Sequence, residues 1–88
     1  MAAYRVEVAT RARRDLERLA PSILGRIHQV LTALGEDPRP TGSQKLVGLA
    51  AYRIRVGDHR VIYEIDDGAR IVVVVRVRHR REVYRTLR

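Results

Sequence analysis

Arginines recur at every second position in two segments of the sequence, and this spacing could gather their guanidinium groups on one surface. The segment YRIRV carries Arg53 and Arg55, and the segment VRVRH carries Arg76 and Arg78. Alternate side chains of an extended strand point to the same face of a sheet, so each pair shares a face. A guanidinium presents a flat fork of donors that matches the oxygens of a phosphate. The spacing therefore indicates a site for a polyanion, of which nucleic acid is the commonest.

The charge of the whole chain supports the same interpretation. The 88 residues include 18 Lys and Arg against 10 Asp and Glu, which gives a net charge of +8 at pH 7. Residues 45–88 hold eleven of the basic and five of the acidic side chains, whereas residues 1–44 hold seven and five. A genome rich in G and C would explain why 17 of the cations are arginine. It explains the difference between the two halves less well.

Several kinds of chemistry are excluded by what the sequence lacks. There is no cysteine, and the three histidines have no partners at metal-ligand spacing, so we expect no metal and no cofactor. Neither serine lies in a nucleophile elbow, and there is no phosphate-binding glycine loop. The arginines remain, together with His79 and Tyr84 near the C-terminus. Such a set suits stabilisation of the negative charge on a phosphodiester transition state, where RNA supplies its own 2′-hydroxyl nucleophile.

The pattern of apolar residues predicts one α+β domain over residues 1–88. A half-buried strand over residues 4–8 precedes a helix with Thr10 as its N-cap. Pro21 starts a second helix, for which Gly35 is the expected C-cap, and the two helices form a hairpin. Residues 35–44 are expected to be loop. Three strands follow, at residues 51–56, 60–66 and 70–78.

The register of these strands decides which arginines meet. A two-residue turn at Gly57-Asp58 pairs Arg55 with Arg60. The apolar side chains that alternate with these arginines then point toward the helices. A bulge at Gly68 then directs Val75 and Val77 to the core. One face of a small, mainly antiparallel sheet carries the helical hairpin, and the other gathers the arginines at positions Arg53, Arg55, Arg60, Arg76 and Arg78.

No segment predicts a membrane location. The longest apolar run is residues 71–75, far short of the ~20 residues that a spanning helix needs. The N-terminus carries no apolar stretch of signal-peptide length. We therefore expect a cytoplasmic protein with no membrane partner.

Three segments resemble the RelE branch of the RelE/ParE toxin superfamily. They are KLVGL at residues 45–49, YRIRVGDHRVIYEID at 52–66 and RVRHRREVYR at 76–85. The second resembles the family pattern most specifically, and the third matches the family's H-R-x-x-V-Y. The resemblance spans nearly the whole chain and implies a helical hairpin on a small antiparallel sheet, as the apolar pattern does.

The resemblance also implies a function. RelE-like toxins of type II toxin–antitoxin pairs enter the ribosomal A site and cut mRNA there, without a metal, by attack of the 2′-hydroxyl on the adjacent phosphate. The resemblance places the family's basic catalytic residues on Arg53, Arg55 and Arg60. It places the family's late arginine on Arg80, with Arg78 as second candidate, and its C-terminal tyrosine on Tyr84. The implied partners are an acidic antitoxin, the ribosome and mRNA, with operator DNA bound through the antitoxin.

These residues divide into two expected roles. We expect Arg60 and Arg80 to clamp the reacting phosphate, with Tyr84 and His79 contributing to catalysis, because arginine holds its proton too tightly to act as a base. The expected RNA-binding residues are Arg53, Arg55, Arg76 and Arg78.

Two other functions are compatible with the sequence. A ParE-like toxin would share the fold and inhibit DNA gyrase instead of cutting RNA. A non-catalytic basic module would only bind RNA or its antitoxin. The segment HRREVY favours the RelE branch, because ParE-like toxins usually lack the complete set of late arginine and tyrosine.

Overall fold

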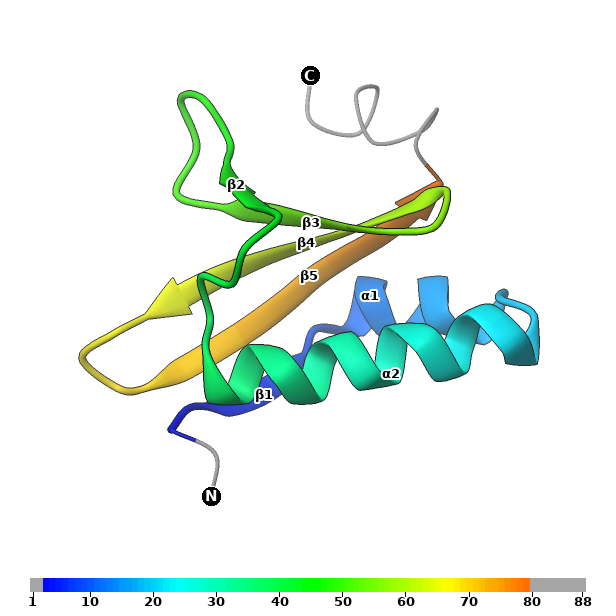
Figure 1. The fold of residues 1–88 in the computed structure, drawn as a ribbon, viewed down its shortest axis with the longest axis horizontal. Helices are drawn as coiled ribbons and strands as arrows, with labels where there is room; N and C mark the ends of the chain where they lie inside the picture. Colours follow the sequence, from blue (N-terminus) through cyan, green and yellow to red (C-terminus); the bar gives the residue numbers. More distant parts are fainter. Residues whose placement is uncertain (1–2, 80–88) are drawn as a thin grey trace.

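Two helices cover one face of a five-stranded sheet in the computed structural model, which describes residues 3–79 (Figure 1). The helices are α1 (Thr10–Glu17) and α2 (Pro21–Glu36). The strands are β1 (Arg5–Val8), β2 (Ser43–Lys45), β3 (Tyr52–Val56), β4 (His59–Asp66) and β5 (Ile71–His79), and they lie in the order β1-β5-β4-β3-β2. Only β1 pairs in parallel, with β5. The predicted α+β class and the mainly antiparallel sheet are therefore confirmed.

The helices form the predicted hairpin, but their ends differ from the prediction. Figure 1 shows the chain running out along α1 and back along α2 beneath the sheet. Pro21 begins α2 at its first turn, as expected, because its fixed φ suits that position. Thr10 is the first residue of α1, and Ala9 is its N-cap. Gly35 is inside α2, which continues to Glu36, and its carbonyl accepts a hydrogen bond from the backbone of Tyr4 at 2.9 Å.

The apolar core lies between the helices and the sheet, as the alternation predicts. Ile27 and Leu34 of α2 are fully buried against Val61 and Tyr63 of β4. The β3–β4 register is also as predicted, since Val56 pairs with His59 and Arg55 with Arg60 across the Gly57-Asp58 turn. The two-residue turn thus fixes which side chains of this hairpin face the helices.

The irregularity between β4 and β5 lies elsewhere than predicted. The ladder shifts between Ile62 and Tyr63, which pair with Arg76 and Val74, so Val75 is the extra residue of a bulge. Val74 and Val77 consequently face the helices, while Val75 packs with Ile62 on the other face. The predicted bulge at Gly68 and the predicted core position of Val75 are wrong. A run of four valines is apolar on both faces, so its alternation cannot show where the shift occurs.

A segment predicted as loop forms the edge of the sheet. Ser43–Lys45 is strand β2, which pairs with the first three residues of β3. The chain between β2 and β3 then brings Leu46 and Ala51 over Ile62, which makes a second, smaller apolar cluster on the arginine face. Residues 43–45 carry polar side chains, so no apolar pattern indicated a strand. Neither helix in the described part of the chain is long and apolar enough to cross a membrane.

Candidate functional site

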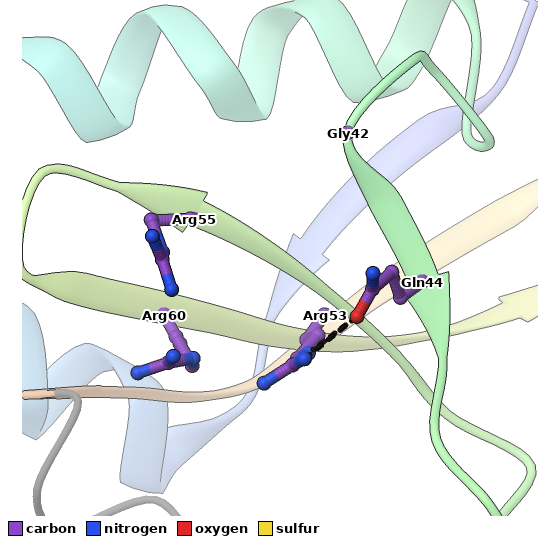
Figure 2. Close-up of a pocket in the computed structure, with 5 residues that line it drawn as sticks. All are labelled: Gly42, Gln44, Arg53, Arg55 and Arg60. Carbon is purple, nitrogen blue, oxygen red and sulfur yellow. Dashed lines mark hydrogen bonds between the residues drawn. The ribbon is translucent and has the colours of Figure 1, made fainter.

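Three arginines line one hollow of about 330 Å³ on the sheet face opposite the helices (Figure 2). Arg53 and Arg55 come from β3, and Arg60 comes from β4 directly across from Arg55. Gly42 and Gln44, at the start of the edge strand, complete the lining. The structure therefore brings together three of the arginines that the sequence placed on one face, and it adds a wall that the sequence did not predict.

Gln44 holds Arg53 in place. Its Oε1 accepts hydrogen bonds from Nη2 of Arg53 at 2.6 Å and from Nε at 3.2 Å. The two residues are cross-strand partners in the β2–β3 ladder, which explains their contact. A guanidinium held along one edge keeps its orientation, and that lowers the entropy lost when it binds a phosphate. No pattern in the sequence indicated Gln44, because it lies in the segment expected to be loop.

The charges in this hollow have one sign. Arg55 and Arg60 lie directly opposite each other, an arrangement that destabilises a ladder when both residues carry the same charge. Arg60 is only 6% exposed, so its charge is the least solvated of the three. Among residues 3–79, those that line the hollow include no carboxylate. An oxyanion bound between these guanidinium groups would relieve their repulsion and receive several charge-assisted hydrogen bonds.

Arg76 and Arg78 lie on the same face by register but are bound to an acidic residue of α1. Asp15 accepts hydrogen bonds from Nε of Arg76 at 3.0 Å, from Nη2 of Arg76 at 3.2 Å and from the backbone N–H of Val77 at 2.9 Å. The oxygen that accepts from Nη2 of Arg76, Oδ1, also lies 3.6 Å from Nη1 of Arg78. Neither arginine lines the three-arginine hollow.

Asp15 could have been noticed in the sequence. It follows Ala12 by three residues and precedes Leu19 by four, so it lies on the apolar face of α1. A carboxylate there must be paired when the face is buried, and Asp15 is 7% exposed.

His79 lies apart from the hollow. Its register partner is His59, and the two rings meet edge to face with centroids 5.6 Å apart. Alternation puts both on the helix-facing side of the sheet with Val61 and Val77, and they line a separate hollow of about 220 Å³ together with Arg78. The structure thus separates His79 from Arg53, Arg55 and Arg60. Arg80 and Tyr84 lie outside the described residues.

A polar cluster anchors the loop that leads into the hollow. Arg39 donates two hydrogen bonds to the carboxylate of Asp67, at 2.8 and 3.2 Å, and one to the hydroxyl of Tyr52 at 3.2 Å. The hydroxyl of Tyr4 donates to the same carboxylate at 2.6 Å. These donors lower the pKa of Asp67 to about 2. The hydroxyl of Tyr63 also holds this loop, because it donates a hydrogen bond to the carbonyl of Pro38 at 2.8 Å.

The described side chains of this hollow can bind and polarise a phosphate, and none of them is an imidazole or a carboxylate that could accept a proton. A guanidinium group donates hydrogen bonds and has no acceptor of its own, so it is a poor general base. Over residues 3–79, His, Asp and Glu nowhere gather in threes that could hold a metal ion. The side chains present therefore suit charge stabilisation at a phosphodiester.

Comparison with known proteins assigns this chain to a class of small toxins. The family model described as "ParE toxin of type II toxin-antitoxin system, parDE" matches residues 6–84. The toxin RelG of Mycobacterium tuberculosis is 38% identical over 84 residues, which cover 93% of this chain and 97% of RelG. The toxin RelE of the same organism is 35% identical over 86 residues, which cover 93% of this chain and 87% of that toxin. The chain belongs to the RelE/ParE family of type II toxin–antitoxin system toxins.

Solved structures agree with this assignment. The RelBE2 toxin–antitoxin complex of M. tuberculosis contains a chain that superposes with a TM-score of 0.80 at 34% identity, covering 88% of this chain and 98% of that one. A mutant of the Escherichia coli toxin RelE in the free state superposes with a TM-score of 0.78 at 27% identity, covering 97% and 93%. The resemblance noted in the sequence is thereby confirmed, as is the predicted fold.

Proposed function

We propose that this toxin is a ribosome-dependent mRNA endoribonuclease. The observation that carries the proposal is the convergence of Arg53, Arg55 and Arg60 on one hollow. RNA cleavage without a metal needs two contributions, a 2′-hydroxyl that the substrate brings and stabilisation of the charge on the reacting phosphate. Three guanidinium groups supply the second contribution.

The reaction is an internal transesterification. The 2′-hydroxyl attacks the adjacent phosphorus, the bond to the 5′-oxygen breaks, and the products carry a 2′,3′-cyclic phosphate and a 5′-hydroxyl. Arg60 is placed to clamp the phosphate, while Arg53 and Arg55 bind the flanking backbone. Arg80 is the proposed second clamp, with Arg78 as the alternative.

Proton transfer requires other groups, because arginine is a poor base. A histidine side chain can serve as a general acid or base, and a tyrosine can position or stack on an RNA base, so His79 and Tyr84 are both proposed to contribute. Since His79 does not line the hollow in this structure, its role depends on the conformation of the bound state and is settled by mutation.

We further propose that an acidic antitoxin masks this toxin in the cytoplasm, and that the complex binds operator DNA through the antitoxin. A chain of net charge +8 should bind an acidic partner quickly and in a salt-sensitive way. An apolar groove of about 480 Å³ between α1 and α2, lined in part by Leu16, Leu24 and Leu31, fits an apolar helix of that partner. Related chains from M. tuberculosis and Pyrococcus horikoshii have been solved as complexes of this kind, with RelB in the second case.

Gyrase inhibition remains the second candidate function. It is favoured by one observation, the match of residues 6–84 to a family described as ParE toxins. RNA cleavage is favoured by the identity to toxins named RelG and RelE. The third candidate is a basic module that only binds RNA or an antitoxin and cuts nothing.

One experiment separates these functions. Purified toxin is added to ribosomes programmed with a defined mRNA, the mRNA ends are mapped, and a DNA gyrase supercoiling assay runs in parallel. Cleavage in the ribosomal A site with supercoiling unaffected supports the proposal. Inhibition of supercoiling with intact mRNA supports the ParE-like function, and an effect on neither supports a binding-only module.

A further inference from the structure

A second hollow lies on the other side of β3, between that strand and α2. Its volume is about 300 Å³, and its polar lining comes from Arg26, Gln29 and Arg55. Val30, Ala33 and Val56 form its apolar wall. The proposed function gives this hollow no role, although it adjoins the proposed RNA site.

The face of α2 that lines this hollow is defined by helical spacing. Arg26, Gln29, Val30 and Ala33 follow one another at i, i+3, i+4 and i+7, so they share one side of the helix. The guanidinium of Arg26 lies against the β3–β4 turn, because a Cβ on Gly57 would be 3.3 Å from its Nη1. Gly57 has a φ of +60° and no side chain, which permits both the tight turn and this close approach.

Arg55 joins the two hollows. It lines the three-arginine hollow and also the hollow beside α2. The edge strand β2 pairs with β3 only as far as Ile54, so no strand within residues 3–79 covers the edge of β3 at Arg55 and Val56. Basic side chains therefore continue from Arg60 across Arg55 to Arg26, around an open strand edge. The described residues that line the two hollows include no acidic side chain.

We infer that Arg26 and Gln29, together with Arg55, form a second phosphate-binding position for the single-stranded RNA that enters the three-arginine hollow. The inference rests on the proposed function. An RNA strand repeats its phosphates along one chain, so a strand held at Arg53 and Arg60 can continue over the uncovered edge to α2. The guanidinium and the amide donate to a phosphate there, and the apolar wall contacts a ribose.

The test measures binding of RNA without cleavage. Short and long single-stranded RNAs, of about 4 and about 12 nucleotides, carry 2′-O-methyl groups so that no 2′-hydroxyl can attack. Affinity is measured by fluorescence anisotropy at several salt concentrations. Arg26→Ala should weaken binding of the long RNA about tenfold. It should also lower the slope of log affinity against log salt by about 0.7, which is the loss of one contact to a single strand. Binding of the short RNA should not change.

The matched control is Arg13→Ala, which removes the same charge from an exposed position on the other helix. If Arg26→Ala and Arg13→Ala affect the long RNA equally while Arg60→Ala weakens both RNAs, the inference is wrong and the proposed RNA site stands. If Arg60→Ala and Arg55→Ala change neither affinity, the proposed RNA site itself fails. If Arg26→Ala weakens binding of the antitoxin but not of RNA, the hollow receives a protein, which also overturns the inference.

Discussion

Asp15 and Arg76, 61 residues apart in the sequence, form an ion pair that joins α1 to β5. The pair is mostly buried, with 7% and 17% of the two side chains exposed. The pairing of β1 with β5 ends at Val74. Beyond this point the carboxylate of Asp15, rather than a strand carbonyl, accepts a hydrogen bond from the backbone N–H of Val77. Asp15 thus stabilises the edge of the sheet and orients two arginines of the opposite face.

Removal of this carboxylate should destabilise the protein strongly. Asp15→Ala leaves the guanidinium of Arg76 and the N–H of Val77 without their acceptor, and loss of one member of a buried pair costs about 3–5 kcal/mol. Chemical denaturation followed by circular dichroism measures the change. Glu17→Ala, at an exposed position of the same helix, is the control and should lie within about 0.5 kcal/mol of the parent protein. An Asp15→Ala protein as stable as the control would show that the ion pair contributes nothing.

The arginines of the hollow should differ in how their loss affects cleavage. Arg60→Ala should lower the rate on programmed ribosomes about 10²–10³-fold even at saturating toxin, because it removes a donor to the transition state. Arg53→Ala should be rescued largely by more toxin or less salt, because it removes a flanking contact. Arg70→Ala, in the β4–β5 turn away from the hollow, controls for net charge. Equal saturating rates for Arg60→Ala and Arg70→Ala would contradict the assigned role of Arg60.

The last residue of β5 and two residues that follow it in the sequence should matter for the chemical step. Arg80→Ala should reduce the saturating rate as Arg60→Ala does. Tyr84→Phe and His79→Ala should each also lower the saturating rate below that of the parent protein. The RNA products should end in 2′,3′-cyclic phosphate, which chemical end-mapping detects. Unchanged cleavage by a triple variant with Arg60→Ala, Arg80→Ala and Tyr84→Phe would remove the ribonuclease assignment from these residues.

Stability should depend on pH through Asp67. Its pKa is about 2 in the folded protein, because Arg39 and Tyr4 donate hydrogen bonds to it, against about 3.9 for an unfolded aspartate. A lowered folded pKa contributes stability that is present above about pH 4 and is lost as the pH falls toward 2. The melting temperature of Asp67→Asn should therefore approach that of the parent protein between pH 4 and pH 2. A constant difference across that range would contradict this assignment.

Two leucines of α2 should respond differently to the same substitution. Leu31→Asp places a charge in the core without a partner and should unfold the protein, since Leu31 is 9% exposed. Leu24→Asp changes a side chain that is 38% exposed and should leave the fold intact while weakening the antitoxin complex. Circular dichroism and co-purification measure the two effects. A folded Leu31→Asp protein would contradict the core position of Leu31. A Leu24→Asp protein that still binds the antitoxin as well as the parent does would contradict the proposed docking groove.

The arginine hairpin could be predicted from the sequence because its geometry is local. A two-residue turn fixes the pairing of Arg55 with Arg60, and strict alternation of apolar and charged residues fixes which face Arg53 shares with them. The helical hairpin follows from apolar periodicity in the same way. These features depend on neighbours within a few residues, so one sequence suffices to place them.

Contacts between distant segments could be decided only by the tertiary structure. The bulge at Val75 depends on how two strands align, and a run of valines fits either alignment. Gln44 meets Arg53 because a polar segment completes an edge, and Asp15 meets Arg76 because β1 is too short to cover β5. The sequence by itself determined which side chains a strand presents together. The packed fold decided which of them line the hollow and which pair with Asp15, because a long-range pairing depends on the whole arrangement of elements and leaves no local periodicity.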